Sequence, residues 1–159
     1  MLLNFDGAWR AGLICKIVMT AIAALLLATQ AVAIAPSSGT VTIAITGLRN
    51  ARGTLRACMT RSPSHFPNCD RDPESLGRTV SARVATIEFG EVPVGDYAIE
   101  VFHDENDNGK FDTFLGIPKE GFGFSRNPRV NFKTPRFDEV DIKIAPGLSR
   151  LTVRMQYLL

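Results

Sequence analysis

The sequence predicts an all-β fold: an immunoglobulin- or transthyretin-like antiparallel β-sandwich of about seven strands, preceded by a signal peptide. Two observations predict the sandwich. Apolar and polar side chains alternate with a period of two in several short runs, and turns containing Gly or Pro separate these runs. A third observation, an apolar leader, predicts the signal peptide. No segment carries a sustained apolar stripe at the helical period.

The leader has the three parts of a secretory signal. Arg10 and Lys16 are the only basic residues in the first 35, and both precede an apolar run over 17–28. Small residues at Ala31 and Ala33 then form the A-x-A pattern that a signal peptidase reads. We therefore expect a signal peptide at 1–33.

Cleavage of this leader sets the expected organisation and location of the mature protein. A short linker at 34–39 would precede one β-sandwich domain at 40–159, and the protein would be periplasmic or secreted. The alternative is that the segment 17–35 is not cleaved. It is just long enough to span a bilayer, so the chain would then be N-terminally membrane-anchored.

Each expected strand is a run in which every second residue is apolar. In the first run Val41, Ile43 and Ile45 share one face, and threonines occupy the other. The expected strands lie at 40–46, 55–59, 80–89, 97–101, 140–144 and 151–157. On their apolar faces the later runs place Leu55, Ala57, Met59; Ala85, Ile87, Phe89; Tyr97, Ile99, Val101; Val140, Ile142, Ile144; and Leu151, Val153, Met155, Tyr157.

One long interval, 103–129, shows no clear strand. It nevertheless contains four phenylalanines: Phe111, Phe114, Phe122 and Phe124. Loops longer than about 12–15 residues are usually functional or disordered, and four aromatic residues argue against disorder. We therefore expect this loop to be ordered and to form one end of the sandwich.

The charge balance excludes one class of partner. The chain carries 18 Lys and Arg against 16 Asp and Glu, a net charge of +2. This near-balance gives no electrostatic basis for nucleic-acid binding, and we expect no membrane association of the domain once the signal is removed.

Two cysteines, Cys58 and Cys69, remain in the mature part. An even pair in an oxidising compartment predicts a disulfide. The alternatives are two free thiols or a metal-binding pair.

The segment Asp104–Asp112 matches the first nine positions of a D-x-[DN]-x-[DN]-G calcium loop. The twelfth position is Leu115 instead of the usual glutamate, and Glu120 could supply the missing carboxylate only if the chain folds back. The alternative is a tight turn built by Asp, Asn and Gly without metal. The candidate ligands of Ca²⁺ are Asp104, Asn106, Asn108, the Lys110 carbonyl and Asp112.

The next segment, 116–125, alternates glycine with aromatic residues. Phenylalanines between glycines can stack on a sugar ring or a peptide side chain. Phe122, Phe124, Lys119 and Glu120 are therefore candidate ligand-binding residues. The alternative is that these phenylalanines belong to the core at the open end of the sandwich.

Hydrolytic chemistry has little support, and we expect a protein that is not an enzyme. The sequence contains no G-x-S-x-G elbow and no H-E-x-x-H helix. A hydrolase would have to use His103 and Ser125, the only histidine and serine of the long loop that could pair.

Four stretches of this region carry a family resemblance: Val94–Ile99, Val101–Asn106, Asn108–Asp112 and Leu115–Ser125. They resemble the signature of domain of unknown function family 2141, and the similarity extends over about 40–157. The resemblance implies an exported bacterial β-sandwich protein with no established activity.

Together these features predict an uncharacterised exported protein that binds a ligand without catalysis. The expected ligand is a carbohydrate or a cell-envelope protein, held at 103–129 in a loop ordered by Ca²⁺. The alternative function is a structural or assembly module of the cell envelope that binds no small ligand.

Overall fold

The computed structural model describes residues 37–69, 71–131 and 133–159. The predicted signal peptide at 1–33 lies outside the described residues. Within the described part, no helix is long and apolar enough to cross a membrane. These residues belong to one compact unit with its own apolar core.

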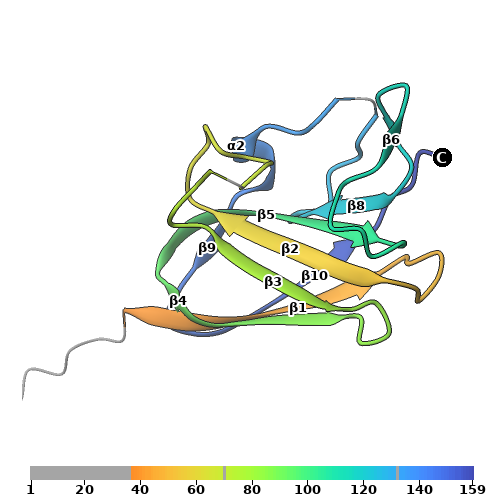
Figure 1. Cartoon of the computed structure of the whole chain (residues 1–159). Helices are drawn as coiled ribbons and strands as arrows, with labels where there is room; N and C mark the ends of the chain where they lie inside the picture. Colours follow the sequence, from red (N-terminus) through yellow and green to blue (C-terminus); the bar gives the residue numbers. More distant parts are fainter. Residues whose placement is uncertain (1–36, 70, 132) are drawn as a thin grey trace, which may run out of the picture. The chain divides into compact units, whose positions relative to one another are not determined.

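The described residues form ten short strands and one helical turn (Figure 1). The elements are, in chain order, β1 (Ser38–Thr46), β2 (Thr54–Thr60), β3 (Leu76–Ser81), β4 (Thr86–Pro93), β5 (Gly95–Asp104), β6 (Thr113–Phe114), β7 (Ile117–Pro118), β8 (Gly121–Phe124), α2 (Phe137–Val140), β9 (Ile142–Ile144) and β10 (Gly147–Arg154).

The strands form two main sheets and a hairpin, and the predicted all-β class is confirmed. One sheet has the order β10-β1-β4, and the other has the order β3-β2-β5-β8 with β9 also pairing with β5. The strands β6 and β7 pair only with each other. Pairing is antiparallel except between β1 and β10, which run parallel in a regular register from Gly39–Gly147 to Thr46–Arg154. The prediction of a purely antiparallel arrangement is therefore wrong at this pair.

One apolar core collects the inner faces of both sheets, as the alternation predicts. In β1 the burial pattern alternates strictly, because successive side chains of a strand point to opposite faces. Each fully buried aliphatic or aromatic side chain contributes about 1.5–3 kcal/mol. Residues with essentially no exposed surface include Val41 and Ile43 of β1, Leu55 and Met59 of β2, Ile87 and Phe89 of β4, and Tyr97, Ile99 and Val101 of β5.

The run 80–89, predicted as one strand, is two strands in different sheets. A turn at 82–85 separates β3 from β4, with the amide of Val84 donating to the carbonyl of Ser81 and Ala85 at φ 51°. The turn contains none of the Gly, Pro, Asn or Asp residues that usually mark one. The only local sign of the turn is a change of phase, because Val84 and Ala85 are consecutive apolar residues.

The strand predicted at 140–144 is shorter than expected. Residues 137–140 form the single turn α2, whose Val140 is buried, and only Ile142–Ile144 pair with β5. The turn begins with Asp138 and Glu139, and the Glu139 carboxylate accepts a hydrogen bond from the Arg136 amide. Acidic residues favour a helix N-terminus, which competes here with the strand pattern.

The long loop contains three strands that were not predicted: the two-residue strands β6 and β7, and the longer β8. Residues 121–124 form β8, which pairs with β5 from Glu100–Phe124 to His103–Gly121. Its Gly-Phe-Gly-Phe sequence has the period of a strand, but glycine is depleted in strands and hid the pattern. A Cβ at Gly123 would lie 2.6 Å from Val153 Cγ1, so the inner face of β8 has room only for hydrogen. The prediction that 103–129 lacks strands is wrong for this reason.

We predict that Gly123→Ala destabilises the domain by about 2 kcal/mol, because overpacking a tight contact forces its neighbours to move. The measurement is the free energy of unfolding in urea. The control is Gly77→Ala in β3, where a Cβ would meet nothing within 4 Å. Equal stability of the two variants would contradict the close packing of β8.

Candidate functional site

An open cleft of about 1150 Å³ lies over the outer face of the five-stranded sheet. Its floor comes from β2, β5 and β8, and it includes Arg56, Glu100 and Phe102. Its walls are segments outside the sheet. They are the loop carrying Pro67, Asn68 and Cys69, the stretch that carries Gly109–Phe111 and Leu115–Pro118, and the chain around Val130, Lys133 and Thr134.

Six phenylalanine rings lie along this outer face, each in contact with the next. We call them the phenylalanine row. The row is Phe102, Phe111, Phe122, Phe124, Phe66 and Phe137, with adjacent ring centroids 5.7, 6.3, 6.0, 5.7 and 6.3 Å apart. Most of these pairs meet edge to face, the arrangement that aromatic rings prefer at such distances. We call residues 104–112 the acidic loop. The row links this loop to the loop after β2 and to α2.

The predicted ligand-binding residues occupy different environments. Phe122 and Phe124 are only 4% and 3% exposed, and they form an outer-face apolar cluster with Ala98 and Val140. Their burial favours the core interpretation. Lys119 is exposed, whereas the Glu120 side chain is buried beneath the acidic loop.

The partly exposed aromatic residues of the cleft are Phe102 and Phe111. The guanidinium of Arg56 lies 5.8 Å from the centroid of the Phe102 ring and 3.9 Å from the carboxylate of Asp104. Phe102 and Arg56 were not predicted as site residues, because period-two alternation indicates only one apolar face for each strand. The apolar side chains Ala98 and Phe102 on the opposite face of β5 could have indicated a second buried surface.

The acidic loop is organised by hydrogen bonds from its backbone to its own side chains. The Asp104 carboxylate accepts from the amides of Asn108 (3.0 Å) and Gly109 (2.8 Å). The side-chain carbonyl of Asn106 accepts from the Asn108 amide, and that of Asn108 from the Lys110 amide. These hydrogen bonds fix the side chains of three predicted ligands, Asp104, Asn106 and Asn108.

Two further carboxylates close this loop. Asp112 Oδ2 lies 2.8 Å from Asn106 Nδ2 and 3.1 Å from Asn108 Nδ2. The chain folds back, and the Glu120 carboxylate accepts hydrogen bonds from the amides of Glu105 and Asp112, each at 3.1 Å. The structure therefore places Asp112 against Asn106 and Asn108, and places Glu120 against the backbone of the same loop.

The donor chemistry of this loop suits Ca²⁺, but the orientation of the amides suits a hydrogen-bonded turn. Nowhere in the described residues do three His, Cys, Asp or Glu side chains gather closely enough to hold a metal. A calcium shell would therefore need amide oxygens as well. Rotating the amides of Asn106 and Asn108 would exchange their nitrogens for oxygens facing Asp112, a change that only a cation between them could stabilise.

Glu105 and Glu120 experience opposite electrostatic effects. Burial raises the pKa of Glu120, and nearby Asp104 and Asp112 add to this effect, while its two backbone hydrogen bonds oppose it. Burial also tends to raise the pKa of Glu105, but hydrogen bonds from Arg49 and Asn50 outweigh it and lower the pKa overall. Ionised Glu120 therefore costs stability above its raised pKa, whereas ionised Glu105 stabilises the fold.

The proposed catalytic pair is not assembled. Ser125 bonds to the backbone of Ile99, four residues along β5 from His103, which places the two roughly 13 Å apart. Buried His103 hydrogen-bonds through Nε2 to the Arg52 carbonyl and through Nδ1 to the Tyr157 hydroxyl. Both residues therefore hold structural bonds and do not act together.

Two sets of contacts fix the walls of the cleft. Cys58 of the floor and Cys69 of the wall lie at disulfide distance, with their Cα atoms 6.4 Å apart, in agreement with the predicted pair. The side-chain amide of Asn127 donates to the Thr152 carbonyl and accepts from the Arg154 backbone amide, in the same way as a neighbouring strand would pair with β10. Gln156 bonds in the same way to Pro128 and Val130.

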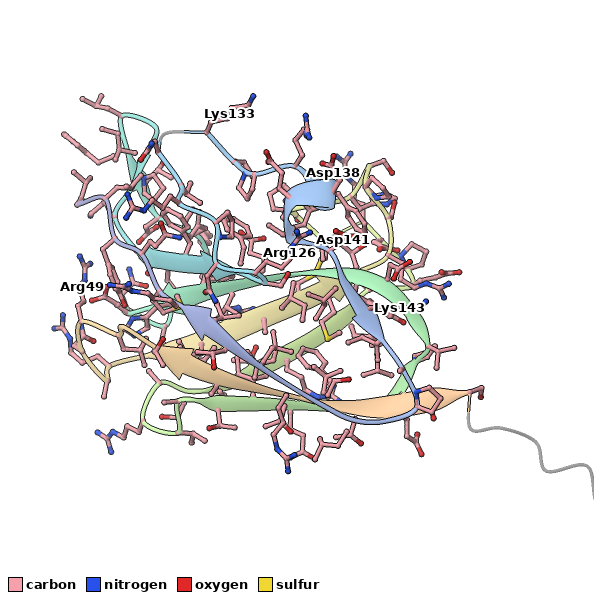
Figure 2. The ribbon with its side chains drawn as sticks, turned by 180° about the vertical axis from the view of Figure 1, so that it is seen from behind. Arg49, Arg126, Lys133, Asp138, Asp141 and Lys143 are labelled. Atoms are coloured by element: carbon pink, nitrogen blue, oxygen red, sulfur yellow. A yellow bond between two sulfur atoms is a disulfide. The ribbon has the colours of Figure 1, made fainter. Side chains whose placement is uncertain are left out.

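Figure 2 shows Arg49 well apart from Arg126 and Asp141, which lie beside the helical turn. Arg49 lies at the acidic loop. Its guanidinium is 2.6 Å from the Glu105 carboxylate, and its Cζ lies 4.5 Å from the centroid of the Tyr157 ring. Near α2, Arg126 bonds to the Asp141 carboxylate at 3.1 Å. Arg49 therefore stabilises the end at which the acidic loop begins.

The comparisons with known proteins give one match. Residues 43–151 match a family described as an uncharacterised protein conserved in bacteria, domain of unknown function family 2141. The match spans more than half of the chain and includes the acidic loop, β8 and most of the cleft. Neither the curated proteins nor the solved structures give a match.

We predict that Glu105→Gln lowers the free energy of unfolding by about 1–2 kcal/mol at pH 7, because it removes charged hydrogen bonds to Arg49. The pKa of Glu105 is lowered in the folded state, so its contribution is present above the ordinary value of 4.5 and is lost as the pH falls through the lowered pKa. The difference from the native protein should therefore shrink in acid, measured by urea unfolding from pH 7 to pH 3 with a chelator present.

The matched control is Asp138→Asn. Asp138 forms an ion pair with Arg136, but both side chains are more than 60% exposed. This variant should change stability by less than about 0.5 kcal/mol at any pH. A pH-independent loss for Glu105→Gln would show that packing, not charge, is responsible.

Proposed function

We propose that the chain, which belongs to domain of unknown function family 2141, is an exported binding module that performs no catalysis. Its leader supports export to the periplasm or the exterior. We also infer that its two sheets form an immunoglobulin- or transthyretin-like sandwich. The shared core supports this, as does the Tyr97 hydroxyl, which donates to the Pro93 carbonyl four residues upstream like a tyrosine corner.

The ligand that we propose is a carbohydrate chain, bound in the cleft over the outer sheet face. The observation that carries this proposal is the pairing of half-exposed rings with charged groups on one open floor. Phe102 and Phe111 offer apolar faces for sugar C–H groups, and Arg56 and Glu100 offer hydrogen-bonding groups beside them. The cleft is open, which suits an extended polymer better than an enclosed small molecule.

Calcium would act on this cleft through the acidic loop. Phe111 belongs to that loop, and its ring contacts Phe102 and Phe122 on the floor. Asp104, Asn106, Asn108, the Lys110 carbonyl and Asp112 would hold the ion, and its charge would offset the cost of ionised Glu120. We propose that Ca²⁺ fixes the loop and with it the position of Phe111.

A second candidate function is a structural or assembly module of the cell envelope. The burial of Phe122 and Phe124 favours it, because these rings then serve the core alone. The two functions differ in what Phe111 does, since a module without a small ligand needs no exposed ring on the cleft floor.

We predict that the protein binds an immobilised bacterial envelope polysaccharide and that Phe111→Ala weakens this binding at least tenfold, because the variant removes one stacking surface. Affinity electrophoresis in gels containing the polysaccharide measures the binding. The control is Phe114→Ala, since Phe114 is also exposed but does not line the cleft. Equal retardation of both variants, or none for the native protein across envelope glycans, would remove the carbohydrate proposal.

We predict that Ca²⁺ raises the melting temperature and releases measurable heat on binding, and that Asp112→Asn abolishes both effects because it removes a ligand charge. Calorimetry after chelator treatment is the measurement. The matched control is Asp107→Asn in the same loop, whose carboxylate bonds to Thr54 and lies at a non-ligand position. Absence of heat and of a thermal shift would leave the loop as a hydrogen-bonded turn.

A further inference from the structure

The hairpin formed by β6 and β7 has an unusual turn. Phe114 pairs with Ile117, and the two residues between them, Leu115 and Gly116, have φ values of 50° and 80°. A two-residue turn with two positive φ angles favours Asn-Gly or Gly-Gly, because most side chains are strained in this conformation. A leucine at the first position therefore stores backbone strain.

The same residue is almost completely exposed. Leu115 is 88% exposed and its neighbour Phe114 is 60% exposed, so the tip presents two large apolar side chains to solvent. Figure 1 shows this hairpin, labelled β6, standing out from the sheets. Asparagine at this position would reduce the backbone strain and would also remove the exposed apolar surface. Although Leu115 lines the rim of the cleft, its side chain is not packed into either apolar cluster, and strain of this kind occurs most often at functional sites.

Cations surround the base of this tip. Lys110 precedes the hairpin and Lys119 follows it, and both are exposed. Neither makes an ion pair with any described residue. The nearby Asp112 is half-buried and engaged by the amides of Asn106 and Asn108. The hairpin is thus an apolar tip flanked by two exposed lysines that have no ion-pair partner among the described residues.

We propose that this hairpin inserts its tip, Phe114 and Leu115, into the surface of an anionic phospholipid bilayer. Apolar side chains enter the acyl boundary, and lysines at their base contact phosphate headgroups. Two side chains bury too little area for a stable protein interface, which needs about 1,000 Å² or more, but they suffice for reversible contact with lipid.

The test uses residues 37–159, which form a compact unit with their own core, and vesicles of phosphatidylglycerol or of phosphatidylcholine alone. Co-sedimentation should detect binding to the anionic vesicles only, and 0.5 M NaCl should weaken it. Leu115→Asn should reduce partitioning about tenfold while keeping or raising the melting temperature, since asparagine tolerates the left-handed turn. Replacing both lysines, Lys110→Gln with Lys119→Gln, should weaken binding about fivefold for each charge removed.

The control is Val84→Asn, which removes an apolar side chain of 60% exposure from the β3–β4 turn and should leave vesicle binding unchanged. Phe111→Ala should also leave it unchanged, which separates this surface from the glycan cleft. The proposal is overturned if the native protein does not bind anionic vesicles, or if Leu115→Asn binds them equally well. Self-association of the native protein that Leu115→Asn abolishes, without vesicle binding, would show that the tip contacts a second copy instead of lipid.

Discussion

Burial of both faces of β5 is the constraint on which the rest of the structure depends. Its inner face places Tyr97, Ile99 and Val101 in the core shared by the two sheets. Its outer face places Ala98 in the second cluster and Phe102 in the phenylalanine row. A strand that is apolar on both sides must be covered on both sides. Segments outside the sheet, among them the loop with Pro67–Cys69 and the chain with Val130 and Lys133, therefore become walls of the cleft.

The end of β5 links this packing to the acidic loop. Asp104 is the last residue of the strand and is fully buried, so the loop starts from a rigid position. The loop returns to the sheet through Glu120 and β8, whose glycines let the backbone approach Val153 and Tyr157. A change in the loop therefore acts on Phe111 and the cleft more readily than on the core, which explains how an ion could influence binding without refolding the domain.

The two proposed surfaces adjoin at this end of the domain, because Leu115 of the hairpin tip also lines the wall of the cleft. The two partly exposed rings of the cleft are Phe102 on β5 and Phe111 in the acidic loop. The hairpin that carries the tip is held by β6–β7 pairing and, at its base, by the Lys119 amide, which donates to the Asp112 carbonyl. A module that contacts lipid through the hairpin would carry its cleft close to the envelope surface, where polysaccharides are anchored.

The sequence by itself determined the all-β class, the Cys58–Cys69 pair and the family, because period-two alternation, an isolated cysteine pair and a long motif are local signals. It also identified the residues of the acidic loop. Only the tertiary structure decided that β10 runs parallel to β1, that Glu120 returns to the acidic loop, and that His103 and Ser125 are apart. Each of these depends on which distant segments meet. The role of the glycines in β8 was equally hidden in the sequence. Position 123 has no room for a side chain because Val153, thirty residues later in the chain, packs against it.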